Sequence, residues 1–258
     1  KMNEEQKVEA MNSAPDSAEA ATPTAKGKKK RKKMSRKKFW SIIGIVVVVL
    51  VIAGAGMWKW HEEPSFCSTF CHIEADYVAN YSQEQGVQGT DKYGNPVSNT
   101  NAMMSVLHRS NDTTAKSEIK CVDCHVPNME ELAHDGVNFV SGNYYLPRTE
   151  RDGAALMKWD GKESSQLCAN ENCHSYLLGA DGKVDRKKLE KTTADMEFNP
   201  HDTHHANLEM QCTTCHKGHR ASVVACTGCH EHENVEVPDG WLTYQQSQDL
   251  MAKSFGNK

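Results

Sequence analysis

The chain has 258 residues, ten of which are cysteine, and its charge is divided unevenly. Ten lysines and arginines and no acid lie between Lys26 and Lys38, whereas the part from Lys59 onwards holds 18 basic and 29 acidic residues, a formal charge of −11. Phosphate binding needs basic patches, so this acidic part excludes nucleic acid as a partner.

Residues 1–38 are predicted to form a disordered tail. Up to Ala25 the tail is rich in Ala, Glu, Ser, Thr and Pro and has almost no large apolar side chain. It therefore cannot bury enough surface to offset the entropy lost on ordering. The basic run of residues 26–38 ends the tail and is followed directly by an uncharged stretch. This position indicates that the run flanks a membrane segment.

Residues 39–60 are predicted to form a transmembrane helix, because 20 uncharged residues follow from Phe39 and this length crosses a bilayer core. Lysine and arginine flank only its N-terminal side, which places the tail in the cytoplasm, and two tryptophans anchor the far interface. Residues 61–258 are then extracytoplasmic. A cleaved signal peptide, with the small-residue sequence at Ala53 as its cleavage site, is the alternative, and it exports the same region.

The ten cysteines form five close pairs, and the second cysteine of each pair is followed directly by histidine. The five sets are Cys67, Cys71 and His72; Cys121, Cys124 and His125; Cys168, Cys173 and His174; Cys212, Cys215 and His216; and Cys226, Cys229 and His230. Three sets have the form Cys-x-x-Cys-His, whereas CSTFCH has three intervening residues and CANENCH has four.

This spacing is that of covalent haem attachment, in which two thiols add to the two vinyl groups of one haem and the next histidine becomes the proximal ligand of the iron. Structural zinc would need cysteine or histidine in groups of four, and disulfides would need only the cysteines. Neither alternative accounts for the five adjacent histidines. The sequence therefore predicts five covalently bound haem c groups, with CSTFCH as the least standard site.

The exported region has few apolar residues and no sustained helix or strand periodicity. Packed porphyrins would supply the missing apolar surface, as metals and disulfides do in other core-poor domains. We therefore expect a mainly α fold with extensive loops: one N-terminal transmembrane helix followed by a haem-packed multihaem cytochrome c domain over residues 61–258.

Each low-spin haem needs a second axial ligand, and eight histidines lie outside the motifs. The favoured candidates are His201, His205 and His219, which crowd around two motifs in HDTHHANLEMQCTTCHKGH. The next candidates are His108 and His134, which lie elsewhere in the chain. His204 and His232 are spare candidates, His61 is too close to the membrane, and Met103, Met104 and Met129 remain alternatives. Ligation by two histidines gives lower potentials than His/Met ligation.

The part from Phe39 to Pro127 resembles the quinol-dehydrogenase cytochromes of the NapC/NirT and NrfH type. The resemblance rests on the basic segment, the single membrane helix, the first motif just outside it, Tyr81-Ser82, Ser105-x-x-His108 and CVDCHVP. It implies oxidation of membrane menaquinol at the first haem and delivery of electrons to an exported reductase.

The chain departs from that family in three places: its first motif has an extra residue, Glu74 stands where a methionine is often found, and residues 83–104 look inserted. Glu74 or Asp76 could accept a quinol proton beside the first haem. A solvated acidic turn is the alternative. The simplest interpretation of the inserted segment is a solvent loop.

A second resemblance covers roughly Asn199 to Trp241, where NPHDTHHAN, CTTCHKGHR and CTGCH look like the tetrahaem domain of flavocytochrome c fumarate reductases. It implies the distal roles of His201, His205 and His219, although the third histidine of that family's cluster is Leu208 here. In that family a flavin domain is fused to the haem domain. This chain has no dinucleotide fingerprint, so we expect the electron acceptor to be a separate exported flavoprotein.

The leading hypothesis is thus a membrane-anchored conduit from menaquinol to an exported terminal reductase in anaerobic respiration. A haem enzyme that reduces a small nitrogen or sulfur oxyanion is one alternative, but no Cys-x-x-Cys-Lys site occurs. A plain electron relay without quinol oxidation is the other.

Overall fold

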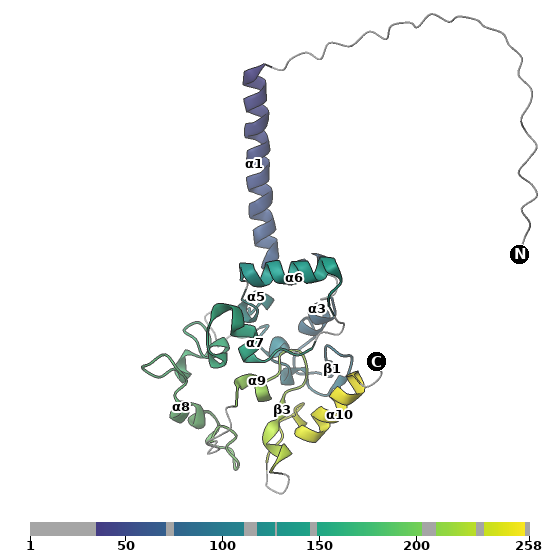
Figure 1. The fold of residues 1–258 in the computed structure, drawn as a ribbon. Coiled ribbons are helices and arrows are strands. Elements are labelled where there is room, and N and C mark those ends of the chain that lie inside the picture. Colours follow the sequence, from purple (N-terminus) through teal and green to yellow (C-terminus); the bar gives the residue numbers. More distant parts are fainter. Residues whose placement is uncertain are drawn as a thin grey trace, which may run out of the picture. The chain divides into compact units, whose positions relative to one another are not determined.

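The computed structural model describes residues 35–70, 75–110, 118–126, 128–144, 149–202, 210–230 and 235–255. The chain divides into two units, Lys1–Leu50 and Val51–Lys258. The described part is mostly helix and irregular backbone, as expected from the sequence, and its helices are short apart from three (Figure 1).

Helix α1 (Arg36–His61) is long and apolar enough to cross a membrane. At 1.5 Å per residue its 26 residues extend over about 39 Å, more than the hydrocarbon core of about 30 Å. It begins three residues before the uncharged stretch, because lysine and arginine are good helix formers and continue the helix. No residue of α1 is buried, which suits a helix surrounded by lipid.

The remaining described helices are short, with two longer exceptions, α6 and α10. They are α2 (Pro64–Phe70), α3 (Ala75–Tyr81), η2 (Thr100–Ala102), α4 (Met104–Leu107), α5 (Cys121–Cys124), α6 (Met129–Ser141), α7 (Gly153–Met157), η3 (Lys158–Asp160), η4 (Ser164–Leu167), η5 (Ser175–Leu177), α8 (Arg186–Glu190), η6 (Lys191–Thr193), α9 (Cys212–Cys215), η7 (Ala225–Gly228) and α10 (Tyr244–Phe255).

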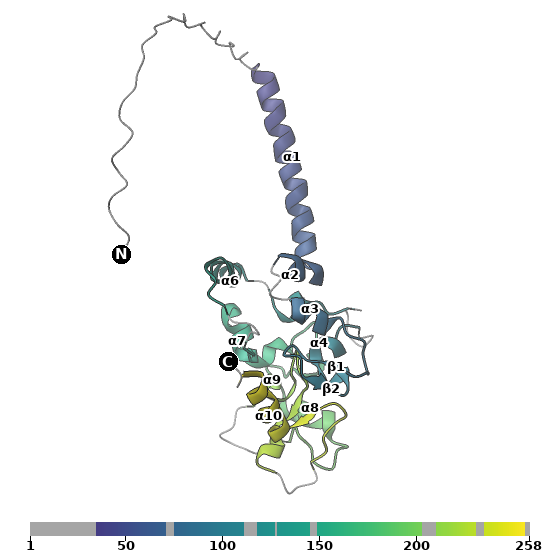
Figure 2. The same cartoon turned by 90° about the vertical axis from the view of Figure 1, so that its right-hand side faces the viewer.

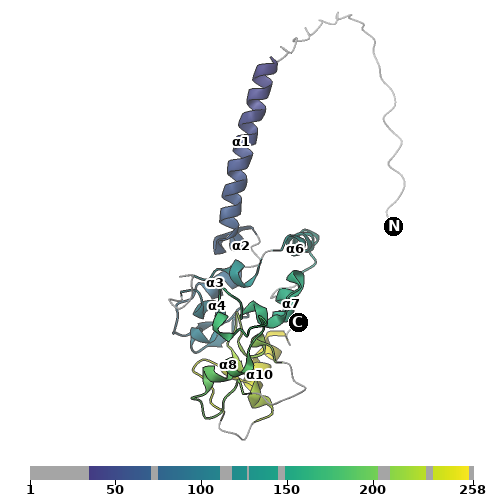
Figure 3. The same ribbon diagram turned by 90° about the vertical axis from the view of Figure 1, so that its left-hand side faces the viewer.

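Strands contribute little to the described structure. β1 (Gly89–Thr90) pairs antiparallel with β2 (Pro96–Val97), and β3 (Val223–Val224) pairs parallel with β4 (Leu242–Thr243). α10 packs against β3, β4 and η7, and α3 lies beside α4 in both side views (Figures 2 and 3).

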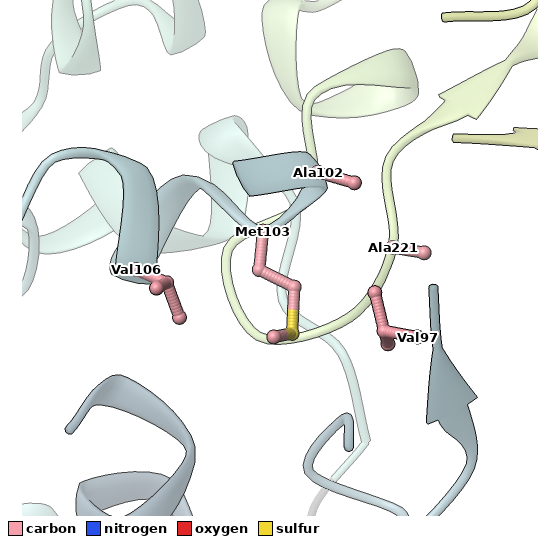
Figure 4. Close-up of a cluster of buried hydrophobic side chains, with 5 residues drawn as sticks. All are labelled: Val97, Ala102, Met103, Val106 and Ala221. Atoms are coloured by element: carbon pink, nitrogen blue, oxygen red, sulfur yellow. The ribbon is translucent and has the colours of Figure 1, made fainter. Parts of the chain in front are cut away.

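The hydrophobic core is small, and it joins the segment 97–106 to residue 221. It consists of Val97, Ala102, Met103, Val106 and Ala221, with Trp241 and Leu242 packed against it. Figure 4 shows the Met103 side chain pointing between the other members.

Segment 83–104 therefore does not form a plain solvent loop. It forms β1, β2 and η2 and supplies part of the core, because the apolar side chains of Val97 and Met103 pack inward.

Candidate haem-binding sites

Four attachment motifs lie wholly in the described part of the chain, and in all four the same backbone hydrogen bond joins the two ends of the motif. The N–H of the motif histidine donates to the carbonyl of the first cysteine: His125 to Cys121 (2.8 Å), His174 to Cys168 (3.1 Å), His216 to Cys212 (2.9 Å) and His230 to Cys226 (2.8 Å). In Cys-x-x-Cys-His this is the bond of one α-turn, which gathers both thiols and the imidazole on one side.

The motif CANENCH has this same hydrogen bond between its ends, although it contains two more residues than Cys-x-x-Cys-His. The additional chain forms a turn of its own, in which the N–H of Cys173 donates to the Asn170 carbonyl (3.2 Å) and the Asn170 side chain bonds back to the carbonyls of Gln166 and Leu167. The longer spacing thus keeps the ends of the motif as close as in the standard form.

The first motif is only partly described. Cys67 lies in α2, whereas Cys71, His72 and Glu74 lie outside the described residues, as does His205. Asp76 is exposed on α3 and lines a cavity of about 670 Å³ together with Asn80, Lys92 and Tyr93.

Three histidines from outside the motifs each lie opposite one motif histidine. The ring centroids are 6.3 Å apart for His125 and His219, 6.0 Å apart for His174 and His108, and 6.3 Å apart for His216 and His201. The ring planes are inclined by 24°, 84° and 30° respectively.

These separations fit two imidazoles bound on opposite sides of one iron. With metal–nitrogen bonds of about 2.0 Å and ring centroids about 1.2 Å behind the nitrogens, two imidazoles that held one iron between them would have their centroids about 6.4 Å apart. Each ring would be free to rotate about the line through the two ligating nitrogens, so inclinations from 24° to 84° are all compatible with a shared iron. A haem supplies the other four ligands, so two histidines are enough.

The protonation of these histidines also suits ligation, because only a neutral imidazole binds a metal. Desolvation, followed by the charge of His201, lowers the pKa of His216 to about 4. Desolvation, followed by the charge of His125, lowers the pKa of His219 to about 3. Desolvation also lowers the pKa values of His174 and His201.

The ring nitrogen Nδ1 of each non-motif histidine in these pairs has a local oxygen partner. His108 bonds the Met104 carbonyl (2.8 Å), His219 bonds Oδ1 of Asn80 (3.1 Å), and His201 lies near the hydroxyls of Thr192 (2.8 Å) and Thr193 (3.1 Å). Such contacts commonly fix the orientation of metal-binding histidines. Asn80, Thr192 and Thr193 belong to no motif, so they could not be singled out from the sequence.

His134 and His230 have other neighbours among the described residues. His134 is exposed on α6, where its ring lies 5.8 Å from that of Trp159. The His230 ring lies 5.7 Å from that of Phe198. Their predicted roles as ligands therefore stay predictions.

The attachment cysteines of successive motifs lie next to one another. A hydrogen bond to Cys212 and burial raise the pKa of Cys168, and the charges of Cys124 and Cys173 raise it further. Burial, followed by the charge of Cys215, likewise raises the pKa of Cys226. The third and fourth motifs are thus joined by a thiol hydrogen bond, whereas the second and third motifs, and the fourth and fifth, are close enough for their cysteines to interact electrostatically.

None of the described cysteines forms a disulfide with another described cysteine, so their sulfur atoms are available for thioether bonds. Within the same residues, no three histidine, cysteine or acidic side chains gather where they could hold a bare metal ion. This arrangement suits a cofactor that carries most of its own ligands.

The chain is similar to the cytochrome c-type protein Cgr1 of Eggerthella lenta. The two are 46% identical over 217 residues, which cover 83% of this chain and 92% of that protein. No protein-family profile matches the chain. No solved structure matches it either.

Proposed function

Since the chain belongs to the c-type cytochromes, we propose that it is a membrane-anchored multihaem electron carrier with five haems, three of them held by the histidine pairs described above. In this proposal His219, His108 and His201 are the distal ligands of the haems attached at His125, His174 and His216. His134 and His205 remain proposed ligands of the other two haems, attached at His72 and His230.

The spacing of the histidine pairs is the observation that carries this proposal. Three pairs, each joining a motif histidine to a histidine elsewhere, have centroid separations within about 0.4 Å of the value of about 6.4 Å expected for two imidazoles that share one iron. Two imidazoles on an iron favour a low reduction potential, which suits a carrier that receives electrons from a low-potential donor.

The order of the motifs supports a linear path for electrons. Cysteines of successive motifs interact from the second to the fifth, and Lys120, just before the second motif, pairs with Glu63 just before the helix of the first. Bound haems supply the one-electron redox chemistry, while the chain sets their spacing and ligands.

The number and ligation of the haems can be tested on the mature protein. We expect its intact mass to equal that of the chain with five haems, and the double variant Cys168→Ala, Cys173→Ala to carry one fewer. Replacing His201 with methionine should change the ligand-sensitive absorbance of one haem only. A native mass with fewer than five haems, or a His201→Met spectrum identical to the native one, would contradict the assignment.

We further propose that menaquinol reduces the haem at the first motif and that an exported reductase, a flavoprotein, accepts the electrons at the other end. The N-terminus is then cytoplasmic and the haem domain extracytoplasmic. Oxidation of a quinol releases two electrons and two protons. Asp76 is exposed, lines a cavity and follows the first motif closely, so it is suited to accept one proton, a role proposed for Glu74 as well.

Anaerobic stopped-flow mixing of the detergent-solubilised protein with a menaquinol analogue tests this step. We expect haem reduction within seconds, slowed about 100-fold in Asp76→Asn if the carboxylate acts as a general base. Asp249→Asn, which removes an exposed carboxylate of α10, is the control and should reduce at the native rate. If dithionite reduces every haem but the quinol reduces none, the protein is a relay without quinol chemistry.

A further inference from the structure

A buried amide adjoins one of the three histidine pairs. Asn80, at the end of α3, is only 2% exposed, and its Oδ1 lies 3.1 Å from Nδ1 of His219. Its Nδ2 donates to the Thr90 carbonyl (2.9 Å) and to Sδ of Met103 (3.1 Å), a member of the hydrophobic core.

These contacts determine which nitrogen of His219 carries the proton. The Thr90 carbonyl can only accept a hydrogen bond, so the amide nitrogen must face it and the amide oxygen must face the histidine. An amide oxygen also only accepts, so Nδ1 of His219 must be the donor. In the neutral ring the lone pair is then on Nε2, the nitrogen available to an iron.

We propose that Asn80 is a positioning residue that holds His219 as a distal haem ligand and thereby sets the reduction potential of the haem attached at His125. The inference rests on the proposed pairing of these two histidines. A hydrogen bond from Nδ1 makes the imidazole a more basic ligand. A more basic ligand stabilises the ferric state and lowers the potential.

Asn80 differs from the anchors of the other two distal histidines. The partner of His108 is a backbone carbonyl, and His201 has two threonine hydroxyls within reach, so no single side-chain replacement removes either anchor. The anchor of His219 is one side chain. Its removal also leaves the Thr90 carbonyl satisfied, because Nε2 of Gln83 donates to the same oxygen (2.7 Å).

Two variants of the full-length holoprotein should move the potential in opposite directions. In Asn80→Leu the Nδ1 proton loses its acceptor, so we expect one haem to be easier to reduce by about tenfold in its redox equilibrium, or about 59 mV for one electron. In Asn80→Asp the acceptor is anionic, and the same haem should shift to lower potential by at least as much. The measurement is an optical potentiometric titration with the low-spin EPR signals followed in parallel.

Ser105→Ala is the matched control. It removes the other side chain near Oδ1 of Asn80 (3.4 Å) without touching the histidine, and should leave all potentials unchanged. In a His219→Met background, which replaces the ligand itself, Asn80→Leu should shift that haem less than twofold. Shifts of equal sign in the two variants, a shift spread over several haems, or a full shift in the His219→Met background would overturn the proposal.

The titration uses chemical reductants and mediators, so its outcome does not depend on quinol oxidation. Failure of the menaquinol experiment would leave the Asn80 shifts intact. Conversely, an unshifted potential in both variants would remove the role of Asn80 and leave the electron-carrier function standing.

Discussion

Replacing Glu150 with glutamine should destabilise the haem-binding region, because it disrupts a half-buried cluster of ion pairs. Glu150 receives two hydrogen bonds from Arg220, from Nε to Oε1 (2.9 Å) and from Nη2 to Oε2 (3.0 Å), and its Oε2 lies 3.4 Å from Nζ of Lys217. The side chains of Arg220 and Glu150 are 9% and 26% exposed. Arg220 directly follows His219, so the cluster also fixes the segment that carries this histidine.

The expected loss in the free energy of unfolding follows from the burial of the Glu150–Arg220 pair. Removing one partner of a fully buried pair costs about 3–5 kcal/mol. Glutamine keeps one oxygen as an acceptor and the site is partly exposed, so we expect about 2 kcal/mol for Glu150→Gln. For a region of this size that corresponds to about 4–8 °C in the unfolding temperature.

The loss should depend on pH. Burial would raise the pKa of Glu150, but the hydrogen bond and charge of Arg220, with help from Lys217, outweigh it and hold the pKa below its usual value. A carboxylate with a depressed folded pKa contributes fully above its unfolded pKa, and the contribution is lost as pH falls through the folded pKa. The difference between the native protein and Glu150→Gln should therefore shrink below about pH 4.

Urea unfolding of the detergent-solubilised holoprotein, followed by circular dichroism at pH 7 and at lower pH, measures both effects. Glu163→Gln is the matched control, because Glu163 pairs with Lys183 at the surface (2.7 Å, with 56% and 62% exposed side chains) and should lose at most about 0.5 kcal/mol. Equal losses in the two variants, or a Glu150→Gln effect that grows in acid, would refute the reasoning.

Three further outcomes are expected. His108→Met should raise the reduction potential of the haem at His174 alone, since a thioether replaces an imidazole; a potentiometric titration checks this, and an unchanged set of potentials would contradict the pairing. Gly240→Ala and Gly94→Ala both force alanine to a positive φ (81° and 82°), but only at position 240 would the Cβ atom approach a backbone oxygen to 2.7 Å. The first should therefore lose at least 1 kcal/mol more in urea unfolding than the second, and equal losses would argue against that contact. Met103→Ala should cost about 2–5 kcal/mol in the same assay, because the side chain is fully buried; a loss below 1 kcal/mol would show that the core can collapse around the smaller residue.

The sequence was most informative where covalent chemistry constrains it. Cysteine spacing and the adjacent histidine are strictly local, so the motifs could be found without any knowledge of the fold. The scarcity of apolar side chains correctly predicted a mainly α fold with extensive loops.

Other features depend on contacts between distant residues and could not be predicted. Segment 83–104 resembled an insertion, yet Val97 and Met103 pack on Ala221, which no local pattern indicates. Which histidine faces which motif is equally a tertiary property: His108 precedes its partner and His219 follows its own. α6 was not predicted: Met129, Leu132, Val137 and Val140 recur at helical spacing over only 13 residues, and all four are exposed in the structure.

The contacts around the second motif also constrain how the protein can mature. Asn80 and His219 are 139 residues apart, and the Ser222 hydroxyl reaches the Ala102 carbonyl across 120 residues. Cys121 and Cys124 are synthesised well before the segment that contains His219 and Ser222, and contacts that close such long loops form slowly. We therefore expect these two thiols to be accessible for haem attachment until the later segments fold back onto residues 80–106.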